Sequence, residues 1–249
     1  MALVATLNNA AAKTQQKIQS SVSALLVSIT VTKSTTLAAA LTAALPLTYS
    51  LSYQIGSQTK DVKTKIPLIM ELMYHSRRGL YIIKDNGATI TISGLLKIGF
   101  NTSMYLADGN TIYFECNEVP AAITELKLES VEYPQYDART YSVERRALDV
   151  ASSNETTLSP EVQDILIDAS QLDTVELFYP NGNSVKWTKA ELNAVATDAM
   201  QIVGIHAGVP VTPSDLAYCF IPCSGANSVK INVNNDTAAY VVKYQNQLA

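Results

Sequence analysis

Histidines are the residues of this chain best suited to acid–base chemistry near neutral pH, and the sequence holds two of them, His75 and His206. A catalytic histidine needs a nucleophile or a substrate proton within hydrogen-bond reach. His75 stands between Tyr74 and Ser76, but no Gly-x-Ser-x-Gly turn accompanies the pair. We therefore predict no catalytic role for His75. We expect His206 to pack in a helix-to-loop connection.

Cysteines and acidic residues are the next candidates, because they bind metal ions. Cys219 and Cys223 have three residues between them, and no second Cys or His pair accompanies them, so the pattern does not indicate a zinc site. Cys116 lies far away, the cysteines are odd in number, and we expect all three to be small core residues. The densest acids, in residues 125–132, indicate a solvated face or a subunit seam. Phosphate-binding loop motifs are missing as well. We predict no catalytic residue, no cofactor and no metal ion.

The composition points to a surface that is covered in the working state. Of the 249 residues, 47% are hydrophobic and only 16% are charged, well below the roughly 25% charged residues of a typical globular protein. Thr, Ser, Asn and Gln supply the polar surface instead, and burying them against a partner costs less than burying charges. The net charge of −4 removes the strongest electrostatic argument for nucleic-acid binding, which needs a concentrated cationic surface. We expect the partners to be other protein subunits.

The N-terminal residues show no positive segment ahead of an apolar stretch, so we predict no signal peptide. The most apolar segments, residues 22–31 and 37–51, are interrupted by polar residues or proline. They fall short of the 18 or so apolar residues that a membrane-spanning helix needs. We therefore predict no membrane span.

The elements that would position any site begin with a helix expected over residues 8–21. Ile18, Val22 and Leu25 recur at helical spacing and form a narrow apolar stripe. Such a stripe at a chain end is completed either by a neighbouring subunit or by the chain's own domain.

Strands are expected from residue 25 to residue 131, interrupted by one short helix over the Ala-rich residues 36–45. Residues 25–31 form a β-branched run, and residues 48–55 alternate strictly between apolar and polar side chains. Turn residues such as Asp85-Asn86-Gly87 separate the later strands, which predicts an antiparallel meander over residues 79–131. The further predicted strands are residues 66–74, 80–84, 88–93, 95–100, 111–116 and 123–131.

The second half mixes helices and strands. We expect a linker or subdomain boundary over residues 133–154 and a short helix over residues 159–169, which starts at Ser159-Pro160-Glu161. Asn181-Gly182 predicts a hairpin, and Thr188 with Glu191 forms a capping box for a second helix. Strands are expected at residues 218–221, 229–233 and 239–244. We find no sequence repeat between the halves.

These patterns predict an α+β, β-rich fold with antiparallel sheets, sandwich or barrel-like, an N-terminal helical arm and two short helices in the second half. The expected domains are the arm (residues 1–24), a β-rich domain (25–145) and a smaller α+β subdomain (146–249). Candidate interface residues come from the apolar stripe, the arginine pairs and the tyrosines near the boundary: Ile18, Val22, Leu25, Arg77, Arg78, Tyr133, Tyr136, Tyr141, Arg145 and Arg146.

In its Ala/Thr/Asn-rich composition, few cysteines, weak charge, helical arm and short strands, the whole chain resembles virion structural proteins of bacteriophages, whether capsid, decoration, neck or tail components. The resemblance rests on no motif and carries over no residue. It implies a non-enzymatic protein made in the host cytoplasm that assembles with copies of itself and with other structural proteins of the virion.

Two alternatives remain open at this stage. A host-attachment or carbohydrate-binding β-module would need an exposed aromatic ledge, for which the 13 tyrosines of the chain offer material. An enzyme would need a deep pocket lined by His75, Arg77 or acidic residues.

Overall fold

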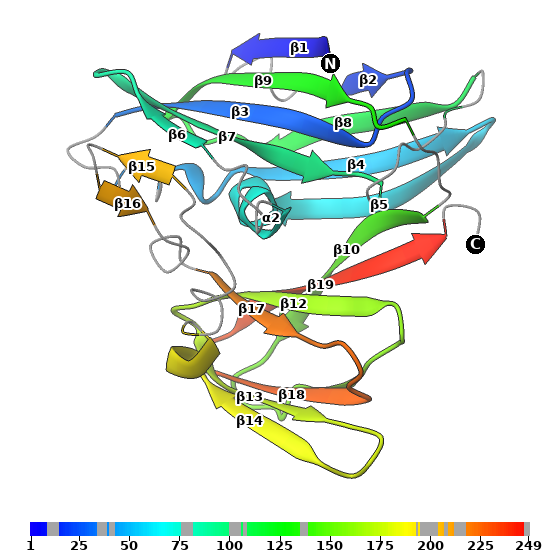
Figure 1. Ribbon diagram of the computed structural model, residues 1–249, viewed down its shortest axis with the longest axis vertical. Coiled ribbons are helices and arrows are strands. Elements are labelled where there is room, and N and C mark those ends of the chain that lie inside the picture. The colour runs from blue at the N-terminus through cyan, green and yellow to red at the C-terminus, as the bar shows by residue number, and fades with distance from the viewer. Residues whose placement is uncertain are drawn as a thin grey trace.

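The computed structural model is dominated by strands that form two stacked sandwiches (Figure 1). It describes residues 1–8, 15–33, 39, 43–75, 82–99, 106, 109–134, 139–192, 194, 204–206, 209–211 and 218–246.

The first sandwich packs a five-stranded sheet against one half of an eight-stranded sheet. The strands of the five-stranded sheet are, in order across it, β1 (Ala2–Asn8), β9 (Ile123–Val131), β3 (Ala24–Thr32), β7 (Thr89–Lys97) and β6 (Ile82–Asp85). The facing strands are β5 (Gln58–Pro67), β4 (Thr48–Ile55), β8 (Thr111–Glu118) and β2 (Gln16–Ile18).

The second sandwich packs the other half of the eight-stranded sheet against a four-stranded sheet. That half consists of β17 (Tyr218–Pro222), β12 (Val162–Asp168), β19 (Thr237–Asn246) and β10 (Arg139–Leu148). The four-stranded sheet consists of β11 (Glu155–Thr157), β18 (Ser228–Val233), β13 (Leu172–Phe178) and β14 (Ser184–Thr188). A separate hairpin joins β15 (Gly204–His206) to β16 (Val209–Val211).

Both sandwiches have the same connectivity. In the first, β1, β3, β7 and β9 form one sheet in the order β1-β9-β3-β7, and the second repeats this order as β10-β19-β12-β17. The opposite sheets match too, as β2-β8-β4-β5 and β11-β18-β13-β14. Eight strands arranged as two facing four-stranded sheets with this order form a jelly roll. The chain is therefore two jelly rolls in tandem, a repeat that the sequence does not reveal.

One sheet runs through both jelly rolls, because β5 of the first pairs in parallel with β10 of the second at Lys63 and Val143. The core divides into two clusters of buried side chains, one for each sandwich. Leu166, Phe220 and Val242 belong to strands of the second sandwich but pack into the cluster of the first. The two jelly rolls thus share a packed boundary.

Alternation in β4 confirms the clearest strand prediction, since Tyr49, Leu51 and Tyr53 are buried and the intervening residues are not. The β-rich, sandwich-like character of the fold is confirmed with it. The hairpin at Asn181-Gly182 is present between β13 and β14, and Gly182 has the positive φ of 81° that such a turn requires.

Helical residues follow β14, as predicted, from residue 189. The Glu191 carboxylate accepts the Thr188 N–H at 2.7 Å and the Thr188 hydroxyl at 2.9 Å, which confirms the capping box. Residues 193 and 195–203 lie outside the described residues.

The helical arm is not confirmed. Residues 2–8 and 16–18 are strands β1 and β2, while residues 9–14 lie outside the described residues. Ile18, Val22 and Leu25 are buried in the first sandwich, where Ile18 lies in β2, Leu25 in β3 and Val22 in the connection between them. The spacing that suited a helical stripe therefore belongs to two strands and the residues that join them.

A helix replaces the strand expected over residues 66–74. Strand β5 ends at Pro67, and α2 (Leu68–His75) follows directly. Every residue of α2 is buried, so the apolar run reflects burial on all sides rather than a strand face. Of the helix expected over residues 36–45, only residues 39, 43 and 44 are described as helical.

A strand replaces the helix expected over residues 159–169. The Ser159-Pro160-Glu161 signal makes a turn in which the Val162 N–H donates to the Ser159 carbonyl at 3.0 Å. β12 follows, with β-branched residues at Val162, Ile165 and Ile167. Pairing on both sides, with β17 and β19, outweighs the local helix signal.

Residues 133–154, expected as a linker or subdomain boundary, fall where the second jelly roll begins, but they are not a linker, because they contain β10, whose ten residues all pair with β19. The expected meander over residues 79–131 is divided between the sheets, because β7 and β9 lie in one and β8 in the other.

Candidate functional site

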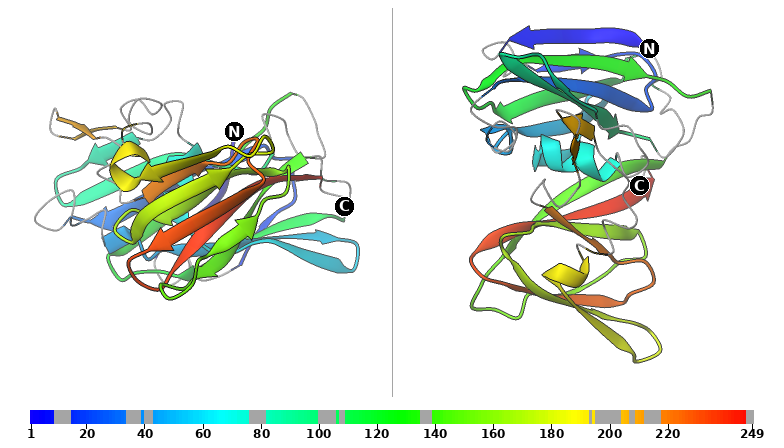
Figure 2. Two further views of the ribbon diagram at one scale, coloured as in Figure 1. Left: turned by 90° about the horizontal axis from the view of Figure 1, so that it is seen from below. Right: turned by 60° about the vertical axis from the view of Figure 1, so that its left-hand side comes forward.

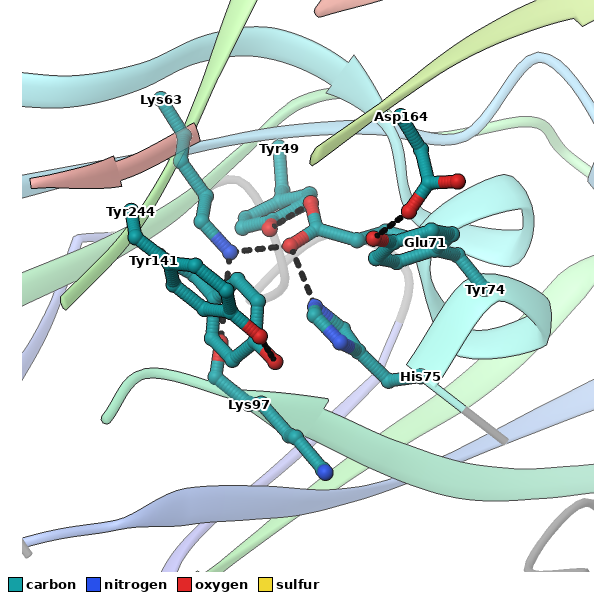
Figure 3. Close-up of polar contacts among 9 residues, drawn as sticks. All are labelled: Tyr49, Lys63, Glu71, Tyr74, His75, Lys97, Tyr141, Asp164 and Tyr244. Carbon is teal, nitrogen blue, oxygen red and sulfur yellow. Dashed lines mark hydrogen bonds and ion pairs between the residues drawn. The ribbon is translucent and has the colours of Figure 1, made fainter. Parts of the chain in front are cut away.

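A buried polar cluster centred on Glu71 of α2 is drawn in Figure 3, and Figure 1 shows α2 on the lower side of the first sandwich. The Lys63 ammonium and the Tyr49 hydroxyl donate to different oxygens of the Glu71 carboxylate. His75 Nε2 lies 3.0 Å from Glu71 Oε1, and Lys63 Nζ lies 3.4 Å from the Lys97 carbonyl oxygen. The carboxylate therefore has three hydrogen-bond partners, which come from β4, β5 and α2.

Local structure explains how these groups meet. Glu71 and His75 are one helical turn apart on α2, so they share a face. Lys63 lies in β5, where the pairing with β4 is irregular on both sides of Leu51, and its side chain points inward with 0% exposure. The Tyr49 ring stacks on Phe114 with the ring centres 5.3 Å apart.

The electrostatics favour one protonation state. Burial raises the pKa of Glu71, but Lys63 and His75 outweigh burial and hold that pKa at about 2. Burial lowers the pKa of His75 to about 4, against the opposing pull of Glu71. Burial also lowers the pKa of Lys63 and raises that of Tyr49. At neutral pH Glu71 is an anion beside the Lys63 cation, and His75 is neutral.

Helix α2 also joins the first sandwich to the second. The Tyr74 hydroxyl donates to Asp164 Oδ2 of β12 at 2.6 Å. The His75 ring meets the Tyr141 ring of β10 edge-on, with the centres 4.9 Å apart. Tyr141 in turn shares a hydroxyl hydrogen bond with Tyr244 of β19. These contacts place α2 at the boundary between the jelly rolls in Figures 1 and 2.

The cluster is built for structure rather than for chemistry on a substrate. The side chains of Lys63 and Glu71 are 0% exposed and that of His75 is 1% exposed, so a substrate cannot reach them. Within the described part of the chain, no three His, Cys, Asp or Glu residues are grouped so as to hold a metal ion. Cys116, Cys219 and Cys223 are buried, as predicted, and form no disulfide with one another.

A groove of about 540 Å³ lies on the surface where β5 meets β10. It exists because the two strands pair at one position and diverge beyond it. Residues of both charges line it, namely Asp61, Val62, Thr64 and Lys65 of β5 and Ser142, Val143, Glu144 and Arg145 of β10. Its mixed charge selects neither an anion nor a cation.

The predicted interface residues do not form one surface. Ile18, Val22 and Leu25 are buried in the core of this chain, and Tyr141 is 5% exposed. Arg145 is exposed at the groove. Tyr133 and Arg146 are half-buried, and Arg146 donates to Glu144 at 3.0 Å. Arg77, Arg78 and Tyr136 lie outside the described residues. Tyr141, Arg145 and Arg146 share strand β10, in which the neighbours Arg145 and Arg146 face opposite sides of the sheet.

Two features escaped the sequence analysis. Glu71 was detectable, since a single acid within the apolar run of residues 66–74 signals a buried, paired charge. The exposed outer edges of β1 and β14 had no such signal, because an edge is defined only by the sheet order.

The fold and site together define a tandem jelly-roll protein with a buried polar cluster at the boundary between its two jelly rolls. No family model and no curated protein match the chain. Among solved structures, the chain is similar to the major capsid protein P2 from bacteriophage PM2, with 10% identity, a TM-score of 0.48, and coverage of 98% of this chain and 94% of that one.

It is also similar to PBCV-1 VP54 fitted into a cryo-EM reconstruction of the virophage Sputnik, with 10% identity, a TM-score of 0.49, and coverage of 92% and 88%. The phage PM2 protein belongs to the class of bacteriophage virion structural proteins that the sequence resembles. Identities and scores this low assign no function to the chain. Over the described residues, no helix is long and apolar enough to cross a membrane.

Proposed function

We propose that this chain is a non-enzymatic structural protein of a bacteriophage virion, present in many copies, and that it serves in the capsid. The observation that carries the proposal is the tandem jelly roll, in which two sandwiches of the same connectivity share one sheet. Jelly rolls are a recurrent building block of viral capsids.

The composition supports the same function. A surface with few charges and many neutral polar side chains loses little on burial against neighbours. Its partners are copies of the chain and other structural proteins of the same virion, and the protein is located in the virion.

The polar groups argue against an enzyme. The Glu71 cluster is closed to solvent, and the groove at β5 and β10 lacks a histidine. Groups poised for acid–base work have to reach a substrate proton. Among the described residues, the groove offers the carboxylates of Asp61 and Glu144, with no histidine beside them.

A carbohydrate-binding module is the competing function, because jelly rolls also occur in lectins. It required an exposed ledge of tyrosines near residues 133–141. Tyr141 is instead buried between His75 and Tyr244. Tyr141 thus supports packing and not sugar stacking at its position.

The test is the mass of the purified full chain in solution, measured by light scattering over a range of concentrations and salt, followed by negative-stain electron microscopy. We expect discrete multi-copy particles, which account for a larger fraction of the protein as its concentration rises. A 26.9 kDa monomer under every condition would contradict the proposal.

A further inference from the structure

The joint inside this chain shows how one jelly roll attaches to the next. The last strand in the β2-β8-β4-β5 sheet of the first jelly roll, β5, pairs with the first strand of the second, β10. The pairing turns two four-stranded halves into one eight-stranded sheet.

The tandem repeat contains a second pair of strands equivalent to β5 and β10, and these two strands do not pair with each other in the chain. β14 holds in the second jelly roll the place that β5 holds in the first, and β1 holds the place of β10. Both are edge strands of their sheets. β14 closes the order β11-β18-β13-β14, and β1 opens the order β1-β9-β3-β7-β6.

The two strands lie at opposite ends of the molecule, β1 at the top and β14 at the bottom in Figure 1, and the right-hand view of Figure 2 agrees. One copy therefore cannot join its own edges. A second copy can, and the sheet that results has the order β11-β18-β13-β14-β1-β9-β3-β7-β6.

Both edges expose apolar side chains. Met1 is 80% exposed, Leu3 at β1 is 61% exposed, and Val185 at β14 is 37% exposed. β1 carries no charged side chain and no proline, and Lys186 is the one charged residue of β14. Natural edge strands are usually blocked by charges, prolines, bulges or covers. Among the described residues, β1 has one irregularity, between Leu3 and Ala5, and β14 has one lysine, so most of each edge is open to pairing.

We propose that the β14 edge of one copy pairs with the β1 edge of the next copy, in the manner of β5 and β10 within the chain. The proposal rests on the proposed function, since it names the contact through which the copies assemble. Such a contact is head-to-tail, with different surfaces of one chain meeting. Neither strand brings a like charge against the other.

Cross-linking between two single-cysteine variants of the full chain tests the contact. Leu3→Cys protein labelled with ¹⁵N is mixed with unlabelled Val185→Cys protein and treated with a short bis-maleimide, and the linked peptides are read by mass spectrometry. The natural cysteines are buried and do not compete. We expect a linked peptide pair that joins residue 3 of a labelled copy to residue 185 of an unlabelled one.

Val150→Cys is the matched control, because Val150 is an exposed apolar residue (51%) in the turn after β10, away from both edges. Mixed with Leu3→Cys protein, it should give no linked pair above background. Equal linking in both mixtures would overturn the proposal.

Charged edge variants supply the second measurement. Leu3→Lys and Val185→Lys should each weaken assembly roughly tenfold or more in dissociation constant, whereas Val150→Lys should leave it unchanged. Circular dichroism and urea titration check that all three variants fold. If the wild-type chain assembles and neither the link nor the weakening is seen, the edge contact is wrong and the proposed function stands. If the wild-type chain stays monomeric, both fail.

Discussion

At the scale of single residues, the most informative group is the Glu71 carboxylate. It is fully buried, holds a negative charge, and accepts hydrogen bonds from Lys63, Tyr49 and His75. A buried ion pair of this kind gains little over a well-packed apolar pair, but removing one partner leaves an uncompensated charge. The cluster therefore specifies where α2 sits more than it adds to the free energy of unfolding.

Lys63→Met should destabilise the protein by about 3–5 kcal/mol, because it strands the Glu71 charge in the core. Urea unfolding followed by tryptophan fluorescence and circular dichroism measures the loss. The control Lys84→Met replaces an exposed lysine and should change the free energy of unfolding by less than about 0.5 kcal/mol.

The double variant Lys63→Met/Glu71→Leu separates charge from packing. It should recover most of the stability lost in Lys63→Met, since no charge remains unpaired. A double variant at least as unstable as the single one would mean that packing, and not charge, dominates the cluster.

The pH dependence of stability follows from the lowered pKa of His75. Its folded pKa, about 4, lies below the unfolded value of about 6.5. Between these values the unfolded state binds a proton that the folded state does not. Stability should therefore fall as the pH drops from about 6.5 towards 4, by up to about 1.4 kcal/mol per pH unit from this residue.

Urea titrations at pH 7, 6 and 5 measure this slope, and His75→Gln is the comparison. The variant should show a flatter slope over the same range, whatever its stability at pH 7. Identical slopes would exclude His75 as the source. Glu71 adds its own loss only at lower pH, as the pH falls from its unfolded pKa towards about 2.

At the scale of elements, sequence signals predicted the structure correctly where an element depends mainly on residues close to it in the sequence. The Asn181-Gly182 hairpin, the alternation of β4 and the Thr188 capping box depend on neighbours in sequence. They were predictable for that reason.

Thr188→Ala tests the capping box. It removes the side chain that bonds Glu191 and should lower stability by about 1 kcal/mol. A thermal melt followed by circular dichroism detects the shift. Thr157→Ala, at an exposed position of β11, should leave the midpoint nearly unchanged. Equal shifts in the two variants would argue that the cap contributes nothing.

Elements that depend on distant partners were not predictable. The Ser159-Pro160 signal is a true helix start in isolation, yet pairing on both sides of β12 makes it a turn before a strand. β10 looked like a linker because it holds several charges. Its side chains Glu144, Arg145 and Arg146 are tolerated because they face solvent or pair across the strands.

At the scale of the whole molecule, α2 couples the two jelly rolls through Tyr74 and Asp164. The sequence could not reveal this contact, because the two residues are 90 positions apart and neither matches a motif. The same holds for the tandem repeat, since a jelly roll is fixed by sheet order, which many sequences satisfy. The β-rich class was predictable, and the topology was not.

Tyr74→Phe should cost about 1–3 kcal/mol, because it takes a donor from a buried carboxylate at the boundary. Tyr53→Phe is its matched control, since the Tyr53 hydroxyl is buried with no hydrogen-bond partner among the described residues. Losing that hydroxyl should be neutral or slightly stabilising. Urea unfolding measures the free energy of unfolding of both variants. An equal decrease in the two would show that the Tyr74 hydrogen bond makes no net contribution to stability.

The pairing of β10 with β19 has a consequence for the order of events during synthesis. All strands of the first jelly roll lie before residue 132, so it can close while the ribosome is still translating the second. β10 must then wait for β19, whose first residue follows 89 positions after the last of β10. At about 5–20 residues per second that wait lasts about 4–18 s. During this time, the folded first jelly roll offers β5 as a pairing partner for the newly made β10.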